Sequence, residues 1–445
     1  MSASLHKTLC GGLYHIHGSL DATINMRMLG MDPFRTDVTG YAETVALYRE
    51  TVGQFTVTEL ECLTRDNRQA GAPVLSWKQF CSSKHGKAML ELEPFTAVQT
   101  ESLTPAVPIR RQEGSSARDK QREVRALEGV KVLELCRIIA GPTIGRCLAA
   151  HGASVIKVTS SKLPDIAFFQ IDVNTGKHCI DLDLRSTEDL ASFKDLLEDA
   201  DVLIDGYRPG ALARLGINTT LLDSIAQRRQ RGFVHVLEDC FGGSDVDPST
   251  GQVAEWAYRA GWQQIADCVT GVAAAQGQFM GLANEEPIVP PLPMSDYGTG
   301  TLGAVAALVG LYRRAKMGGS WRCRTSLVQY DVFLQRLGRY PASIQALLRT
   351  THDDEFFGLR HWDTVDEVGS RAEKSVRRLH PHLFGHQTMQ KAWSRGYGAE
   401  IAWAREAVKV DGVLVGHVRA TRPNGSDEGG WEGWEVDEDM EDGKS

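Results

Sequence analysis

Residues 127–217 alternate over short connections between apolar runs rich in β-branched residues and segments with helical spacing. Residues 130–135 indicate a buried strand, Gly141-Pro142 a turn, residues 143–151 a helix and residues 152–158 a second strand. Alternation of this kind is typical of parallel βαβ units. It predicts an α/β fold built on a parallel sheet.

The same pattern continues further along the chain. Strands are expected at residues 179–184, 201–204 and 233–237, and a helix at residues 187–200. Residues 298–313 are mostly small and apolar, which predicts an interior helix that Gly300 and Gly303 allow to lie close to a neighbour.

Length and charge narrow the class of protein. A chain of 445 residues can hold two domains, and its formal charge of −8, concentrated near its end, is unfavourable for binding nucleic acid. No apolar run approaches the roughly 18 residues that cross a bilayer, so no membrane partner is expected. Nine cysteines without a CxxC pair predict neither a disulfide framework nor a zinc site. We expect a cytoplasmic protein, with a mitochondrial or peroxisomal location left open.

Composition divides the chain into five predicted segments. They are an N-terminal piece resembling a small domain, a linker rich in Pro, Ser, Arg and Lys, a large α/β domain, a C-terminal extension and a disordered acidic tail. Their bounds are 1–98, 99–125, 126–345, 346–425 and 426–445.

The N-terminal piece carries its own signals. Residues 13–17 alternate like a strand, and Thr58 with Glu61 fits a capping box at a helix start. His15 and His17 share one strand face, but no carboxylate or cysteine lies at metal-ligand spacing. They are therefore predicted to be polar surface residues, and no metal is expected.

Several residues could receive a phosphate, although the chain has neither GxGxxG nor a P-loop motif. They are the turn at residues 140–142 before a helix, Lys177 in a polar loop, and Arg208 and Arg214 around a Pro-Gly helix start. Helix N-termini and basic side chains attract phosphate. Each residue alone is more often a plain turn or a solvated charge; together they predict a cradle for a phosphate-bearing cofactor.

A second candidate region combines carboxylates with Gly and Pro between residues 281 and 300. It contains Asn284, Glu285, Glu286 and Asp296. Asp296 either caps the following helix or points into a cleft as an acid, a base or a nucleophile. The residues alone leave both interpretations open.

At this point the chain resembles a known family, the class III CoA-transferases, also called the CaiB/BaiF family. The resemblance follows the order of the motifs at residues 127–142, 152–158, 174–184, 200–216, 295–300 and 318–321, and more weakly includes residues 11–95. It implies a Rossmann-like CoA-binding domain with a smaller α/β domain, a homodimer, and acyl-CoA and carboxylic acids as substrates. Coenzyme A would be the acyl carrier, without a metal.

The resemblance also implies roles for single residues. Transferases of the family attack with an Asp whose position is occupied here by Asn284, followed by Glu285, and the Asp that opens the next helix is Asp296. Family racemases pair that Asp with a His that is missing from residues 261–264. Family positions that touch CoA match Lys177 and Arg214. With the turn and loop residues, the predicted cofactor-binding set is Ile139, Ala140, Gly141, Pro142, Lys177, Arg208 and Arg214.

Three functions therefore stay open. The leading prediction is an acyl-CoA transferase that moves CoA between carboxylic acids through a carboxylate-bound acyl intermediate, with catalytic residues among Asp296, Glu285 and Asn284. The alternatives are an enzyme like 2-methylacyl-CoA racemase that uses Asp296, and a CoA-binding protein that has lost its catalytic activity.

Overall fold

The computed structural model describes residues 3–109, 124–245 and 251–431, which form two compact units. Neither unit is one continuous stretch of chain. Unit 1 consists of residues 1–94, 239–296 and 326–384, and unit 2 of residues 95–238, 297–325 and 385–445. These units do not correspond one to one to the five segments expected from the sequence, and that division remains a prediction.

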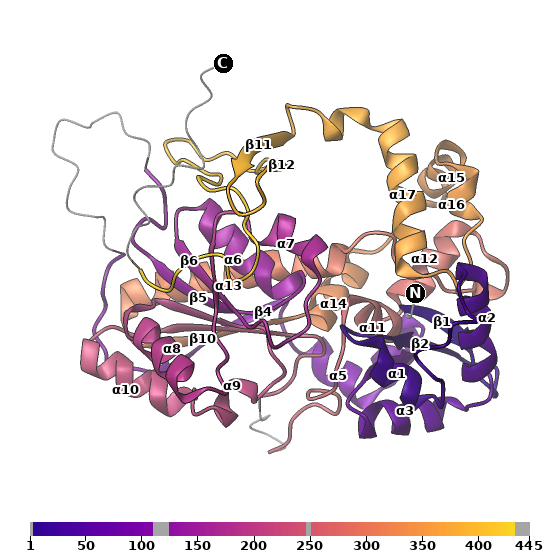
Figure 1. Ribbon diagram of the computed structural model, residues 1–445, viewed down its shortest axis with the longest axis horizontal. Coiled ribbons are helices and arrows are strands. Elements are labelled where there is room, and N and C mark those ends of the chain that lie inside the picture. The colour runs from indigo at the N-terminus through magenta and orange to yellow at the C-terminus, as the bar shows by residue number, and fades with distance from the viewer. Residues whose placement is uncertain (1–2, 110–123, 246–250, 432–445) are drawn as a thin grey trace. The chain divides into compact units, whose positions relative to one another are not determined.

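Unit 2 is built on a seven-stranded sheet with the strand order β4-β10-β9-β8-β5-β6-β7 (Figure 1). The pairs β5–β6, β6–β7, β5–β8 and β8–β9 are parallel, and β4 pairs antiparallel with β10. The predicted parallel α/β fold is thereby confirmed. The strands are β4 Phe95–Glu101, β5 Lys131–Leu135, β6 Ser154–Thr159, β7 His178–Asp181, β8 Val202–Asp205, β9 Val234–Asp239 and β10 Ser320–Ser326.

Helices cover both faces of this sheet because successive strand side chains point in opposite directions. Val132 belongs to a core with α6 and α13, whereas the neighbouring Leu133 belongs to a core with α8 and α10. The helices of this part are α6 Ala140–Ala150, α7 Ala167–Val173, α8 Thr187–Asp199, α9 Ala211–Arg214, α10 Thr219–Arg229 and α13 Met294–Met317, whose first three residues belong to unit 1.

Two glycines allow α13 to lie close to α6, and a proline lies in the first turn of α6. A Cβ on Gly300 would lie 2.5 Å from the Ala140 carbonyl oxygen and one on Gly303 2.6 Å from Ile144, so α13 approaches α6 as predicted. Helix α6 starts three residues before the predicted position 143. Pro142 lies in its first turn, where the N–H that proline lacks has no helical partner to lose.

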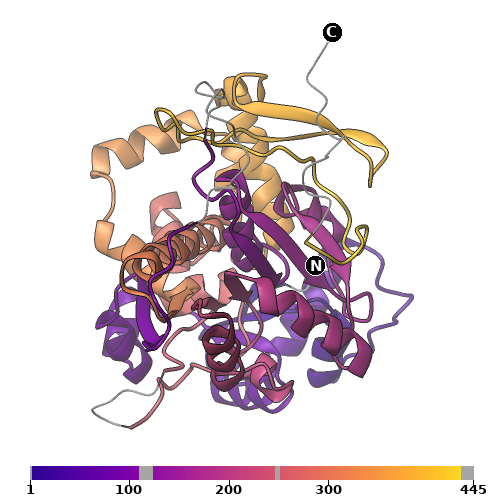
Figure 2. The same ribbon diagram turned by 90° about the vertical axis from the view of Figure 1, so that its left-hand side faces the viewer.

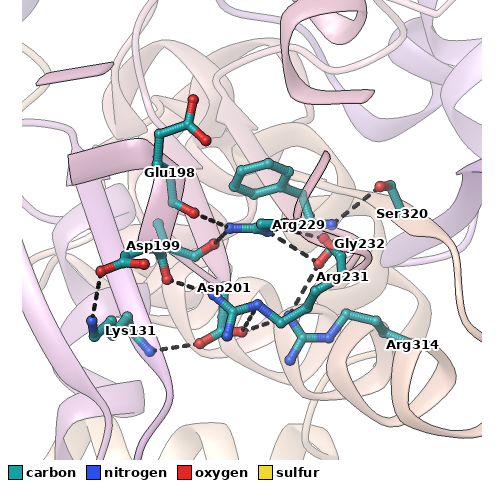
Figure 3. A network of polar contacts seen from close by, with 11 residues as sticks. Lys131, Glu198, Asp199, Asp201, Arg229, Arg231, Gly232, Arg314 and Ser320 are labelled. Atoms are coloured by element: carbon teal, nitrogen blue, oxygen red, sulfur yellow. Dashed lines mark hydrogen bonds and ion pairs between the residues drawn. The ribbon is translucent and has the colours of Figure 1, made fainter. Parts of the chain in front are cut away.

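The amino ends of the central strands are joined by a buried polar network around Asp201 (Figure 3). The Asp201 carboxylate accepts from the Lys131 backbone N–H at 3.0 Å and from Arg314 Nη1 at 2.8 Å, and Arg231 Nε lies 3.6 Å away. Arg229 donates to the Ala200 carbonyl from the end of α10. The network therefore connects β5 and β8 to α10 and α13 at the amino ends of these strands.

The remaining chain of unit 2 adds a hairpin and a terminal segment. Strands β11 Met389–Ser394 and β12 Ala399–Ala404 run antiparallel side by side (Figures 1 and 2). In the first part of the predicted tail, Asp427 accepts from the Cys179 N–H at 2.7 Å and Trp431 donates to the Leu196 carbonyl at 3.1 Å. Residues 99–101 of the predicted linker belong to β4. Linker residues 110–123 and tail residues 432–445 lie outside the described residues.

Unit 1 holds a three-stranded antiparallel sheet, β1-β2-β3, surrounded by helices. Its strands are β1 Ala3–Lys7, β2 Leu13–His17 and β3 Ala70–Pro73. Its helices are α1 Ala22–Met28, α2 Tyr41–Val52, α3 Val57–Asp66, α4 Trp77–Ser82, α5 Lys84–Leu90, α11 Gln263–Val269, α12 Val272–Met280, α14 Leu327–Leu337, α15 Ala342–Thr351, α16 Asp354–Phe357 and α17 Val365–Leu379, with 3₁₀ turns η1 Ala283–Glu285 and η2 Pro381–Phe384. Among the described residues, no helix has both the length and the hydropathy to span a membrane.

Two expectations for unit 1 were wrong. The capping box at the start of α3 is formed by Thr56 and Glu59, not by Thr58 and Glu61, because the same Thr-x-x-Glu spacing occurs two residues earlier, where Thr56 has extended backbone. His15 is fully buried rather than at the surface. Burial holds the pKa of His15 well below its usual value, so it is neutral at physiological pH.

Candidate functional site

An apolar pocket lies where the central parallel strands of unit 2 end. Its volume is about 150 Å³, which suits one ring system better than a whole cofactor. Leu135 comes from the end of β5, Val158 from the end of β6 and Leu182 from just after β7. The rest of the lining is Thr159, Ser160, Leu163, Asp183, Leu184, Arg185, Tyr207, Ala211, Leu212 and Leu215.

Sheet topology explains this position. After β5 the chain passes through α6 to β6 on one side, and it later returns to form β8 on the other side of β5. In an open α/β sheet, ligands bind at the carboxyl ends of the strands where the direction of strand order changes. The Gly206 N–H donates to the Leu135 carbonyl at 3.0 Å, which keeps the ends of β8 and β5 close at this point.

Basic residues belong to the pocket lining or adjoin lining residues. The Arg137 guanidinium lies 5.4 Å from the centre of the Tyr207 ring, and Arg185 pairs with Asp183 through two hydrogen bonds of 2.9 and 3.0 Å. The predicted residues Arg208 and Arg214 are both exposed, on the loop after β8 and in α9. Arg185 thus belongs to the lining, Arg137 contacts the lining residue Tyr207, and Arg208 and Arg214 are next to lining residues in the chain.

The predicted turn before α6 is buried and strained. Ile138 has a φ of 72°, which is rare for a β-branched residue, and Ile139 begins the helix without a side-chain cap. Ile139, Ala140, Gly141 and Pro142 are all buried. The turn is therefore covered by the rest of the protein. Backbone strain such as that of Ile138 concentrates at functional sites.

Lys177, predicted to contact the cofactor, is also fully buried. Its Nζ donates to Glu134 Oε2 and to the Pro142 carbonyl, both at 2.6 Å. Burial raises the pKa of Glu134 and lowers that of Lys177, so the charge of each depends on the other. Lys177 is thus bonded to the predicted turn at Pro142, and its ammonium does not reach the surface.

The predicted catalytic positions Asn284 and Glu285 lie in unit 1 on the 3₁₀ turn η1. Both are exposed, and both have left-handed backbone, with φ of 57° and 53°. Asn tolerates this conformation and Glu does so rarely. Among the described residues, no hydrogen bond joins either of them to Asp296.

Asp296 is half-buried in the first turn of α13, which begins at Met294. It is therefore inside the helix, and the interpretation of Asp296 as the N-cap is wrong. Its N–H donates to Gln263 Oε1 at 2.9 Å. Burial and then the nearby Asp331 raise the pKa of Asp296 to about 7, which suits an acid or base that works near neutral pH.

Sequence reasoning missed two further carboxyl groups of unit 1. Asp267 in α11 and Asp331 in α14 are fully buried, and both lie within hydrogen-bond distance of the Ser295 hydroxyl. The available signal was an acidic residue within each of two largely apolar helical segments. Such residues are seldom buried without a partner.

Comparison with known proteins identifies the domain. The model of CoA-transferase family III matches residues 127–345. Residues 127–345 are therefore a domain of this family. The family III match includes every strand of the parallel part of the sheet and the whole lining of the apolar pocket.

Two curated relatives extend the similarity beyond the family III domain. An acetyl-coenzyme A transferase, nodX, of Hypoxylon pulicicidum is 34% identical over 368 residues, which cover 81% of this chain and 59% of the relative. An acyl-CoA transferase of Gibberella moniliformis is 35% identical over 343 residues, covering 74% of this chain and 56% of the relative. The chain therefore spans less than two thirds of the length of either.

A solved structure has the same fold. It is the orthorhombic crystal form of Rv3272 from Mycobacterium tuberculosis, with a TM-score of 0.50 and 17% identity. The similarity covers 68% of this chain and 98% of that one. At this level of identity, the comparison supports the fold alone.

Proposed function

We propose that this chain is an acyl-CoA transferase that moves coenzyme A from an acyl-CoA to a second carboxylic acid. The observation that carries the proposal is the apolar pocket, with basic residues next to its lining, at the carboxyl ends of the parallel strands of a family III domain. The adenine ring would occupy the pocket, and Arg208 and Arg214 would neutralise the phosphates of the cofactor. Ile139–Pro142 would contribute the shape of the turn, and Lys177 would hold that turn through the Pro142 carbonyl.

We assign the attack on the thioester to Glu285. Asn284 occupies the position of the family nucleophile, but an amide cannot form an acyl anhydride. Glu285 is the adjacent exposed carboxylate on the same strained turn. It would attack the acyl carbonyl and release the CoA thiolate, and Asp296 would act as acid or base near neutral pH. We also expect a homodimer, which light scattering would test.

Transfer is tested with acyl-CoA carrying label in the acyl group. The wild-type protein should form a hydroxylamine-sensitive adduct on Glu285 and exchange CoA between acids, and Glu285→Gln should lose both. Solvent deuterium entering the α-position of a 2-methylacyl-CoA, without exchange of CoA, would instead indicate a racemase. CoA binding without either reaction would indicate a protein that has lost catalysis.

The pocket is tested separately by binding. Leu163 lines the pocket and is 37% exposed, so Leu163→Glu should be tolerated by the fold. We expect CoA to bind this variant about tenfold more weakly, because the new carboxylate repels phosphate and disrupts the apolar floor. Leu103→Glu is the matched control, since Leu103 is 78% exposed and does not line the pocket. Equal affinities in both variants, measured by thermal stabilisation with CoA, would refute the proposed cradle.

A further inference from the structure

We propose that Asp267 and Asp331 hold at least one proton between them at neutral pH through Ser295, and that this pair sets the protonation of Asp296. Asp331 is thus a positioning residue that acts through Asp296. The inference rests on the proposed function in one respect, the assignment of Asp296 as the acid or base.

Hydrogen-bond counting around Ser295 requires a carboxyl proton. Ser295 Oγ lies 2.9 Å from Asp267 Oδ1 and 2.7 Å from Asp331 Oδ1, and all three residues are fully buried. A serine hydroxyl has one hydrogen to donate, and an ionised carboxylate has none. If both contacts are hydrogen bonds, one of the two acids must donate to the serine oxygen.

On its other side, Asp331 has a contact with Thr270 that depends on the protonation of Asp331. Thr270 Oγ1 lies 2.7 Å from the Ala266 carbonyl oxygen and 3.1 Å from Asp331 Oδ2. The carbonyl can only accept, so the threonine hydrogen is used there. A hydrogen bond between Thr270 and Asp331 therefore forms only while Asp331 carries a proton, and it is lost when Asp331 ionises. One proton then remains in the pair, on Asp267, where it serves the contact with Ser295.

The pKa shifts of the two acids agree with a proton held between them. Burial and the charge of Asp331 raise the pKa of Asp267 well above its usual value, and burial raises the pKa of Asp331 to about 7. Moreover, no described residue forms a hydrogen bond with Asp267 Oδ2, a buried atom that would be costly to leave charged. Both shifts favour the protonated forms, and a pKa of about 7 means that Asp331 changes its charge close to neutral pH.

The pair is connected to Asp296 through the backbone and through space. Ser295 precedes Asp296, and the Asp296 N–H bonds to Gln263, which donates its own amide N–H to the Leu292 carbonyl at 3.1 Å. The groups that face these acids are Gln263, Asp267 and Cys268 on α11, Tyr330 and Asp331 on α14, and Ser295 on α13. A negative charge on Asp331 disfavours a second one on Asp296, so ionisation of one delays ionisation of the other.

The experiment is a carboxyl ¹³C NMR titration of the full chain with labelled aspartate, with signals assigned through Asp267→Asn, Asp296→Asn and Asp331→Asn. We expect Asp267 to be protonated at pH 7 and Asp296 to titrate near neutrality. In Asp331→Asn the midpoint of Asp296 should fall by about one pH unit or more, because the repelling charge is gone. Asp354→Asn, at an exposed position of the same unit, should leave it unchanged.

A second variant keeps the test decisive if Asp331→Asn does not fold. Ser295→Ala removes the hydroxyl that stabilises the charged form, so the Asp331 midpoint should rise. Ordinary midpoints near 4 for all three acids, or an Asp296 midpoint that stays the same in Asp331→Asn, would overturn the inference. Because NMR needs no turnover, a protein without transferase activity would refute the proposed function and leave this result standing. In an active protein, the acidic limb of the pH dependence of kcat/KM should shift with the Asp296 midpoint.

Discussion

At the scale of single residues, the backbone of the turn at Asn284 and Glu285 is strained. Asn284 and Glu285 have consecutive left-handed backbone conformations, which cost free energy unless the surroundings impose them. Such strain at the very position where the family resemblance places a nucleophile supports a functional role for the turn. It also means that an aspartate, which tolerates this conformation, could occupy position 284.

At the residue scale we predict that Asn284→Asp moves the acyl adduct from position 285 to position 284 and increases CoA exchange by about an order of magnitude. The reason is that the carboxylate would then lie at the family position. Peptide mass mapping after hydroxylamine treatment locates the adduct. Asn284→Gly, which keeps the left-handed backbone without a carboxylate, is the control. Unchanged exchange in Asn284→Asp would contradict the assignment of this turn as the catalytic one.

Different interactions hold the elements of unit 2 together at the two ends of the strands. At the carboxyl ends, glycines permit the close approach of α13 to α6. At the amino ends, the Asp201 network joins strand ends to helix ends (Figure 3). The Arg314 and Asp201 side chains are only 3% and 6% exposed, so neither charge has water as an alternative partner.

At the element scale we predict that Asp201→Ala lowers the free energy of unfolding by about 3–5 kcal/mol, because it leaves Arg314 buried without its carboxylate. Asp199→Ala is the matched control. Asp199 is exposed and pairs with Lys131 at 3.1 Å, so its loss should change stability by roughly 1 kcal/mol or less. Denaturant unfolding measures both. Equal effects would show that the network is not a significant source of stability.

For the whole molecule, buried histidines contribute to the way stability responds to acid. Burial lowers the pKa of His6 to about 3 and that of His15 well below its usual value. Below about pH 6.5 the unfolded chain binds protons that these folded histidines do not. Their contribution to stability is therefore present above pH 6.5 and is lost progressively as the pH falls.

At this scale we predict that His15→Phe makes the free energy of unfolding less dependent on pH between 6.5 and 5, by roughly 1.4 kcal/mol for each pH unit. The exposed His386 serves as the control, because His386→Phe should leave the slope unchanged. Unfolding curves at several pH values provide the slopes. If His15→Phe had the same slope as the wild type, His15 would have to be accessible to protons in the folded state.

The sequence by itself determined the parallel α/β alternation between residues 127 and 239 and the interior helix that ends near residue 317, because periodicity and turn chemistry are local properties. It also singled out Asp296 and the basic loops. It did not predict α7, α11 or α12. Only the tertiary structure decided that Lys177 is buried against Glu134 and that His15 is in the core. Likewise, only the tertiary structure brought Asp267 and Asp331 to the same serine. Burial and shared protons depend on residues far apart in the chain, and no local pattern records which of them meet.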